Sequence, residues 1–199
     1  MMDTPLLTAL RQQTANLHQD VEQLAFMRQL LSADLQVEQY LQALQRLYQF
    51  VAAVEPNLVH HFGDEQRRDY AYFPRLADIR EDITELGGQV PTIAGAPAHH
   101  CQYQAIGQAY VIEGSTSGGK LLAQRLKKKL GLTHSNGLRY FGFHRRGTWS
   151  LFVAWVAGLE LTATQQQACI EGAKACFQLL LSPVDRRGVA AWQNNLMMT

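Results

Sequence analysis

Residues 110–120 have the sequence Tyr-Val-Ile-Glu-Gly-Ser-Thr-Ser-Gly-Gly-Lys, which places three glycines within one predicted helix. Helix is predicted here because apolar residues recur with a helical period from Ala98 to Leu130, and Gly131 ends the pattern. A glycine inside a helix costs about 1 kcal/mol relative to alanine. Glycine also lets a helix bend and lets another backbone or a flat ligand approach closely. We therefore expect either a close helix crossing, a local loop, or a bent helix that lies against a flat ligand.

The same residues partly fit a second motif. Gly114, Gly119 and Lys120 match the G-x-x-x-x-G-K pattern of a phosphate-binding loop, but Leu121 stands where Ser or Thr would hold magnesium. That motif also requires a preceding strand and a parallel sheet. The chain offers neither, so a nucleotide site is disfavoured.

Helical periodicity extends over nearly the whole chain. Thr4 and Pro5 form a good helix start, Pro74 opens a shorter helix, and Gly87-Gly88 ends it. Residues 132–147 form a connection rich in glycine and aromatic residues. The predicted helices cover about residues 6–24, 37–56 or slightly beyond, 76–86, 98–130, 148–161 and 164–181. We predict an all-α single domain over residues 1–199, with about six to eight helices and a C-terminal tail at 183–199.

Composition and charge exclude several classes of protein. The formal net charge of +1 argues against a protein built mainly to bind nucleic acid. The longest apolar run, residues 151–159, is too short to span a membrane, and the N-terminus does not resemble a signal peptide. The three cysteines are an odd number, and we expect reduced thiols, with Cys169 and Cys176 in the core. A cytoplasmic location is the expectation.

His18 is the candidate metal ligand. It lies beside the apolar stripe of the first predicted helix, and Glu22, one turn later, lies where it can contact and orient the imidazole. Taken alone, a histidine such as His18 is more often an ordinary core residue than a metal ligand. Together with a glycine-rich helix elsewhere, it suits a planar metal macrocycle that takes one axial nitrogen and lies close to bare backbone.

Other metal or catalytic clusters are weak. His99-His100-Cys101 and His60-His61 are adjacent in sequence, and neighbouring residues on a helix point about 100° apart, so they cannot easily share one ion. Neither a Ser-His-Asp arrangement nor a pair of catalytic carboxylates stands out.

Around His18 and the glycine segment of residues 110–119, the sequence resembles a known family, the biliverdin-producing heme oxygenases, and particularly its bacterial branch. The resemblance covers most of the chain. Its specific motifs are Leu10–Glu22 (LRQQTANLHQDVE) and Tyr110–Gly119, and the weaker one is Arg139–Phe143, followed by Trp149 and Phe152. The resemblance implies a single-domain helical bundle with a kinked helix on the distal side of a bound heme.

The resemblance also implies roles for individual residues. His18 matches the proximal iron ligand, and Glu22 matches the residue that braces it. Gly114, Gly118 and Gly119 match the glycines that bend over the heme. Ser115 stands where mammalian-type members carry an aspartate, and bacterial relatives also lack this acid. The expectation is that backbone groups, with Ser115 or Ser117, hold distal water, because a serine hydroxyl does not ionise at physiological pH.

The implied reaction is the oxidative opening of heme, which is both substrate and cofactor, by O2 and electrons to give biliverdin, carbon monoxide and ferrous iron. The heme propionates need cations or hydrogen-bond donors. Arg11, two helical turns before His18, is the first candidate, and the further candidates are Tyr110, Lys120, Arg139 and Tyr140.

The implied partners are an electron donor, such as ferredoxin or a reductase, and a bilin-binding photoreceptor downstream. Lys127–Lys129 and Arg145-Arg146 would suit an acidic redox partner, or simply be a helix end and an exposed loop. Two other functions remain open at this point. One is a non-catalytic heme carrier or sensor on the same fold, which Ser115 keeps open, and the other is a helical relative with a non-heme small-molecule site.

Overall fold

The computed structural model describes residues 4–63, 69–93 and 101–182. These residues contain α-helices and one short 3-10 helix, and they contain no β-strand. The elements are α1 (Pro5–Glu22), α2 (Ala25–Leu30), α3 (Val37–Phe62), α4 (Leu76–Glu85), α5 (Gln102–Leu130), η1 (Phe141–Arg146), α6 (Thr148–Ala157) and α7 (Ala163–Leu181). The all-α prediction is confirmed. The predicted C-terminal tail and the predicted helix start at Ala98 lie outside the described residues.

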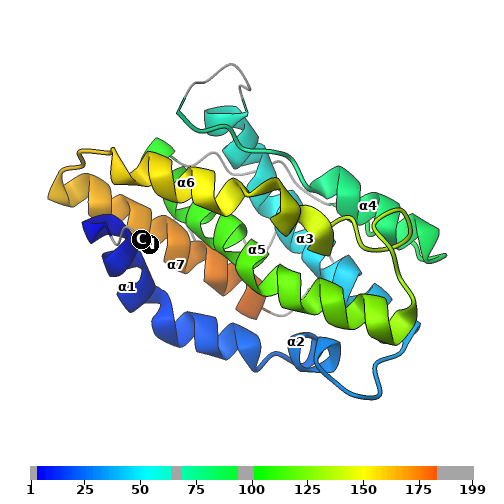
Figure 1. Ribbon diagram of the computed structural model, residues 1–199. Helices are drawn as coiled ribbons and strands as arrows, with labels where there is room; N and C mark the ends of the chain where they lie inside the picture. The colour runs from blue at the N-terminus through cyan, green and yellow to red at the C-terminus, as the bar shows by residue number, and fades with distance from the viewer. Residues whose placement is uncertain (1–3, 64–68, 94–100, 183–199) are drawn as a thin grey trace.

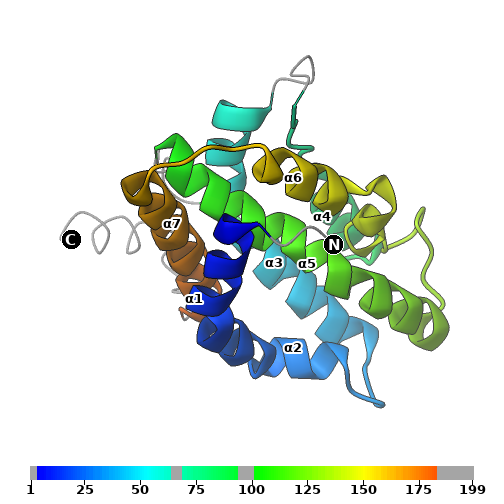
Figure 2. The same ribbon diagram turned by 60° about the vertical axis from the view of Figure 1, so that its left-hand side comes forward.

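Helix α5 is the central element of the bundle. It packs along α7, and α1 packs on α7 in turn, so that these two helices lie on one side of α5 (Figures 1 and 2). Helices α3 and α4 pack together on the other side, and η1 and α6 contact α5 from a third direction. Helix α1, which contains His18, therefore packs mainly on α7 and not directly on α5, which contains the glycine cluster.

A close crossing of α5 and α7 depends on two glycines. A Cβ atom at Gly107 would lie 1.9 Å from the carbonyl oxygen of Cys169, and one at Gly172 would lie 2.2 Å from the carbonyl oxygen of Gln104. Both distances are far shorter than a van der Waals contact. The glycines that allow helix crossing are thus Gly107 and Gly172, and not those of residues 114–119.

Helix α5 bends near its middle, and its two halves run in different directions in Figure 1. Two side chains bond to backbone carbonyls at this point: the Ser115 hydroxyl donates to the Ile112 oxygen at 2.7 Å, and the Thr116 hydroxyl donates to the Glu113 oxygen at 2.6 Å. Hydroxyl groups that bond back to the preceding turn bend helices, and glycine makes the bend easier. The expected kink is therefore present, with a local cause.

Several helix ends follow from the sequence as predicted. The Thr4 hydroxyl accepts from the Leu7 amide at 3.3 Å and caps α1, with Pro5 at the first helical position. Helix α5 ends at Gly131, whose φ of +69° is a left-handed conformation that favours glycine. Cys169 and Cys176 are buried, as predicted, and burial raises the pKa of the Cys169 thiol to about 12.

The structure departs from the predicted helices at α3, α2 and α6. Helix α3 continues through Pro56 to Phe62. Asn57, Leu58 and Phe62 are buried beyond the proline, and the Asn57 amide donates to Gln108 of α5 at 2.8 Å. Helix α2 was not predicted because six residues are too few to show a period. Helix α6 ends at Ala157, four residues earlier than predicted. None of the described helices combines the length and the hydrophobicity needed to cross a bilayer.

Candidate functional site

A cavity of about 450 Å³ lies between α1 and α7 on one side and α5 and η1 on the other. Its size is in the range of small-molecule sites in proteins. Most of its wall is apolar and comes from several helices, including Leu7, Val21, Phe26, Met27, Leu47, Phe50, Leu122 and Phe177. The cavity is open to solvent on one side, as the exposed side chains of His18 and Glu22 at its wall show.

Nearly all of the site residues predicted from sequence line this one cavity. They are Arg11, His18, Glu22, Tyr110, Gly114, Ser115, Ser117, Gly118, Gly119 and Tyr140. The structure does not bring Lys120 or Arg139 to the wall. Lys120 is exposed on α5, and the Arg139 guanidinium pairs with Glu81 at 2.8 Å and with Glu85. These two side chains are therefore not positioned to bind a ligand in the cavity.

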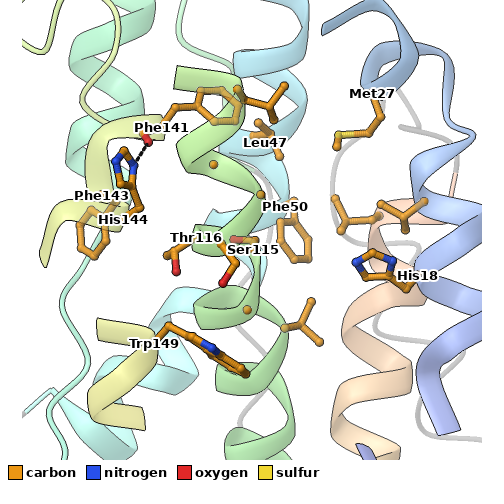
Figure 3. A pocket seen from close by; sticks show the side chains of 18 of the residues that line it. His18, Met27, Leu47, Phe50, Ser115, Thr116, Phe141, Phe143, His144 and Trp149 are labelled. Carbon is orange, nitrogen blue, oxygen red and sulfur yellow. Dashed lines mark hydrogen bonds between the residues drawn. The ribbon is translucent and has the colours of Figure 1, made fainter. Parts of the chain in front are cut away.

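His18 faces the glycine segment across the cavity (Figure 3). Its side chain is 61% exposed, so His18 is not a core histidine. The imidazole Nδ1 lies 3.5 Å from Glu22 Oε1, and the ring meets the ring of Phe177 edge-on at 6.0 Å. These neighbours orient the ring and leave Nε2 for a ligand in the cavity.

A metal held only by protein side chains does not fit this site. In the part of the chain that the structure describes, no group of three or more His, Cys, Asp or Glu residues could hold an ion together. A single imidazole instead suits a metal whose other positions are filled by a second, non-protein ligand, as in a porphyrin. The donor set therefore fits a metal macrocycle better than a free ion.

The glycines of α5 leave open space on the opposite wall. A Cβ atom at Gly118 would meet no other atom within 4 Å, and those at Gly114 and Gly119 would lie 3.7 Å from Trp149 and 3.6 Å from the Phe141 oxygen. Protein packing alone would thus tolerate alanine at Gly118. The absence of a side chain there keeps the cavity wide, which is the arrangement a flat ligand needs.

The hydroxyl groups of Ser115 and Thr116, at the bend of α5, donate their protons to backbone carbonyls. Both residues line the cavity. Because a hydroxyl has a single proton, their oxygens face the cavity as hydrogen-bond acceptors. Tyr110 and Tyr140 remain neutral phenols, since burial raises the pKa of each.

Arg75 is a cavity residue that sequence reasoning missed. Its guanidinium is 1% exposed, donates to the Ile112 oxygen at 2.7 Å and pairs with Glu113 Oε2 at 2.5 Å. Its Nε is the one buried side-chain nitrogen or oxygen of the described residues that has no hydrogen-bond partner. The available signal was Glu113, a carboxylate within an apolar stretch of a helix, which needs a buried partner.

Helix η1 supplies a third wall that the sequence indicated only weakly. Phe141, Phe143 and His144 line the cavity. The buried carboxylate of Asp82 on α4 accepts the backbone N–H groups of Arg139 and Tyr140, each at 2.9 Å, and so anchors the start of this wall. The fold and the site together define an all-helical protein with a cavity that has His18 of α1 on one side and the bare backbone of α5 on the other.

Comparison with known proteins assigns this class to a family. The sequence profile of the heme oxygenase family matches residues 4–184. A heme oxygenase of Xanthomonas campestris pv. campestris (strain 8004) is 30% identical over 154 residues, which cover 76% of this chain and 92% of that protein. The chain therefore belongs to the heme oxygenase family, as its motifs indicated.

Solved structures share the fold. A crystal structure of the NO- and CO-bound heme oxygenase from Neisseria meningitidis superposes with a TM-score of 0.69 and 23% identity, over 88% of this chain and 87% of that one. The heme oxygenase from Leptospira interrogans superposes with a TM-score of 0.69 and 20% identity, over 89% of this chain and 97% of that one. At these identities the likeness establishes the heme oxygenase-like bundle.

Proposed function

We propose that this protein is an enzyme that opens the heme ring with O2 and electrons, releasing biliverdin, carbon monoxide and ferrous iron. The observation that carries the proposal is the cavity of a heme oxygenase family member in which His18 faces the side-chain-free segment of α5. When bound, the iron and the porphyrin supply the redox chemistry. The chain supplies ligation, orientation and a shaped, largely apolar space.

The proximal side of the site is built on α1. His18 Nε2 would hold the iron, and Glu22 would orient the imidazole through Nδ1 and strengthen it as a ligand. Arg11, which lines the same cavity, is the cation best placed to pair with a propionate. The single-domain assignment of residues 1–199 is part of this proposal, because one continuous bundle forms all walls of the cavity.

The distal side is built on α5. The bare backbone at Gly114, Gly118 and Gly119 lets the helix cover the ring closely. Ser115 and Thr116 present acceptor oxygens to this side, so they can hold water by accepting its protons. Ser115 therefore does not replace an acid as a proton donor, and distal water in this protein receives its orientation from acceptors and backbone.

An electron donor such as ferredoxin or a reductase would supply the electrons from a cytoplasmic pool, and a bilin-binding photoreceptor would be one user of the product. The three lysines of the last turn of α5, Lys127–Lys129, offer a basic surface to an acidic donor.

The test is to add hemin and then ascorbate or a ferredoxin system. Loss of the Soret band with growth of a bilin band supports the enzyme. A Soret band that persists would show a heme carrier, and failure to bind hemin stoichiometrically would exclude heme altogether. Chromatography of the product against the bilin isomers would identify the ring position that is attacked.

His18→Ala is expected to remove the iron ligand, shift the Soret band and leave only a small fraction of the turnover rate. The fold should remain intact because the side chain of His18 is exposed. The matched control is His60→Ala, an exposed histidine on α3 outside the cavity. Spectra and rates of His18→Ala that equal those of the control would defeat the assignment of His18.

A further inference from the structure

Four aromatic side chains connect the cavity with the surface of α6. Trp149 lines the cavity beside the bend of α5 (Figure 3), and its ring stacks on Phe152 at 5.8 Å between centroids. Phe152 contacts Tyr70 at 5.5 Å, and Tyr70 stacks on Trp155 at 4.9 Å. We call Trp149, Phe152, Tyr70 and Trp155 the aromatic chain. Trp155, its outer member, is partly exposed.

Tyr70 has a base in contact with its phenol. The Tyr70 hydroxyl donates to Glu113 Oε1 at 2.9 Å, while Oε2 of the same carboxylate accepts from Arg75 and Thr148. The two carboxylate oxygens thus have different hydrogen-bond partners: Oε1 accepts from the Tyr70 phenol, and Oε2 accepts from Arg75 and Thr148. Burial raises the pKa of Tyr70, so the phenol keeps its proton unless the ring is oxidised.

We propose that the aromatic chain carries oxidising equivalents from the cavity to the surface of α6, through Trp149, Tyr70 and Trp155 with Phe152 as the packed spacer. This proposal rests on the proposed function, because the oxidising equivalents arise from heme held in the cavity. Its consequence is protection: an oxidant that fails to attack the ring is removed before it damages the distal wall.

The direction of transfer follows from the chemistry of the rings. Indole and phenol rings give up an electron far more readily than they accept one, so a low-potential donor cannot pass electrons inward through them as reduced intermediates. They can only be oxidised in sequence. The aromatic chain is therefore suited to outward movement of oxidising equivalents, and not to delivery of electrons from ferredoxin.

The electrons and protons balance with two named reagents. Hydrogen peroxide gains two electrons and two protons to form two water molecules, and the hemin complex is left oxidised. Trp149 returns an electron to that complex and is itself reduced by Tyr70, whose proton passes to Glu113 Oε1. Trp155 then reduces Tyr70, which regains its proton from Glu113, and ascorbate in solution reduces Trp155. One passage returns one electron, so two passages restore the hemin complex. Ascorbic acid releases one proton with each of its two electrons, which supplies the two protons that peroxide takes up.

The experiment is to mix the hemin-loaded protein with hydrogen peroxide without ascorbate, freeze it, and record protein radicals by electron paramagnetic resonance. Tryptic mass spectrometry then locates added oxygen. We expect a protein radical and oxygenation of Trp155 in the unmodified protein. In Trp155→Phe, which removes no hydrogen bond recorded in the structure, surface oxygenation is lost and the heme bleaches severalfold faster.

Tyr70→Phe provides a second variant that keeps the aromatic packing but removes the proton transfer to Glu113. It is expected to lower the radical yield severalfold. Tyr103→Phe is the matched control, since Tyr103 lies outside the aromatic chain and bonds to Gln165 at 2.6 Å. Its radical yield should equal that of the unmodified protein.

Two results would overturn the proposal. One is a radical yield and bleaching rate that are unchanged in Trp155→Phe and Tyr70→Phe. The other is oxygenation confined to Tyr110 or Tyr140, which line the cavity directly. Hemin titration of each variant comes first. Absence of hemin binding in the unmodified protein would refute the proposed function and this inference together, whereas normal binding with an unchanged radical refutes the inference alone.

Discussion

Arg75 and Glu113 form an ion pair with almost no contact with water, with exposed fractions of 1% and 0%. Two charges in such a place are stable only together, because each alone would remain buried without compensation. Their partners extend the pair to the Ile112 oxygen, Tyr70 and Thr148. This cluster fixes the turn of α5 immediately before the bend, so it sets the position of the distal wall.

We expect Arg75→Met to reduce the free energy of unfolding by about 3–5 kcal/mol, because the Glu113 carboxylate loses its counter-charge in a buried place. Chemical denaturation monitored by circular dichroism measures the loss.

The double variant Arg75→Met with Glu113→Gln is the control for this mechanism. The neutral amide oxygen still accepts from Tyr70, so the double variant should be more stable than Arg75→Met alone. A double variant that is less stable than the single one would show that loss of packing, and not the unpaired charge, causes the effect.

At the scale of the element, α5 contains glycines of two kinds. Gly107 lies against α7 with no room for a Cβ atom, whereas Gly118 faces open space in the cavity. Glycine thus allows close helix packing at position 107 and leaves room for a ligand at position 118.

Gly107→Ala should destabilise the fold by about 3 kcal/mol or more, since the new methyl group would overlap the Cys169 carbonyl and force α5 from α7. Gly118→Ala should instead raise stability by up to about 1 kcal/mol, because alanine is the better helix former. Thermal unfolding of the two variants in the absence of hemin measures both effects. Equal destabilisation by the two changes would contradict this division of roles.

Gly118→Leu tests the same wall with ligand present. Its side chain would extend into the space between α5 and His18, so hemin affinity and turnover should both fall while the axial imidazole ligation of any bound hemin persists. Hemin titration and absorption spectra provide the measurement. Full activity in this variant would mean that the bend does not cover the ligand.

At the scale of the whole molecule, α4 anchors the wall that η1 contributes. Asp82 accepts two backbone N–H groups at residues 139 and 140, and Glu85 accepts the Gly137 amide at 2.9 Å. Burial raises the pKa of Asp82 from an ordinary value of 3.8 to about 6, outweighing the hydrogen bonds and Arg139, which lower it.

The stability of the protein should therefore depend on pH through Asp82. Because its pKa is higher in the folded than in the unfolded state, the folded state binds the proton more tightly. The resulting stabilisation is full below about pH 4 and is lost as pH rises through about 6, by up to about 3 kcal/mol.

Asp82→Asn removes this titration. The free energy of unfolding of Asp82→Asn minus that of the unmodified protein should rise between pH 4 and pH 7, as measured by urea denaturation at each pH. A difference that stays constant over this range would show that Asp82 titrates normally in the folded state.

The sequence by itself determined the helical class and most helix positions, because helical period and caps depend on residues near one another in the chain. The resemblance of two separate motifs to one family, and not a local pattern, indicated that His18 and the α5 glycine segment belong to one site. The extension of α3 past Pro56, the removal of Arg139 from the site and the roles of Arg75 and Asp82 were decided only by tertiary structure. Each depends on burial or a partner distant in sequence: Gln108 for Asn57, Glu81 and Glu85 for Arg139, Glu113 for Arg75, and the 139–140 backbone for Asp82. The local sequence does not identify the partner of a buried charged residue, since the free energy that keeps the charge buried comes from groups that only the folded chain brings together.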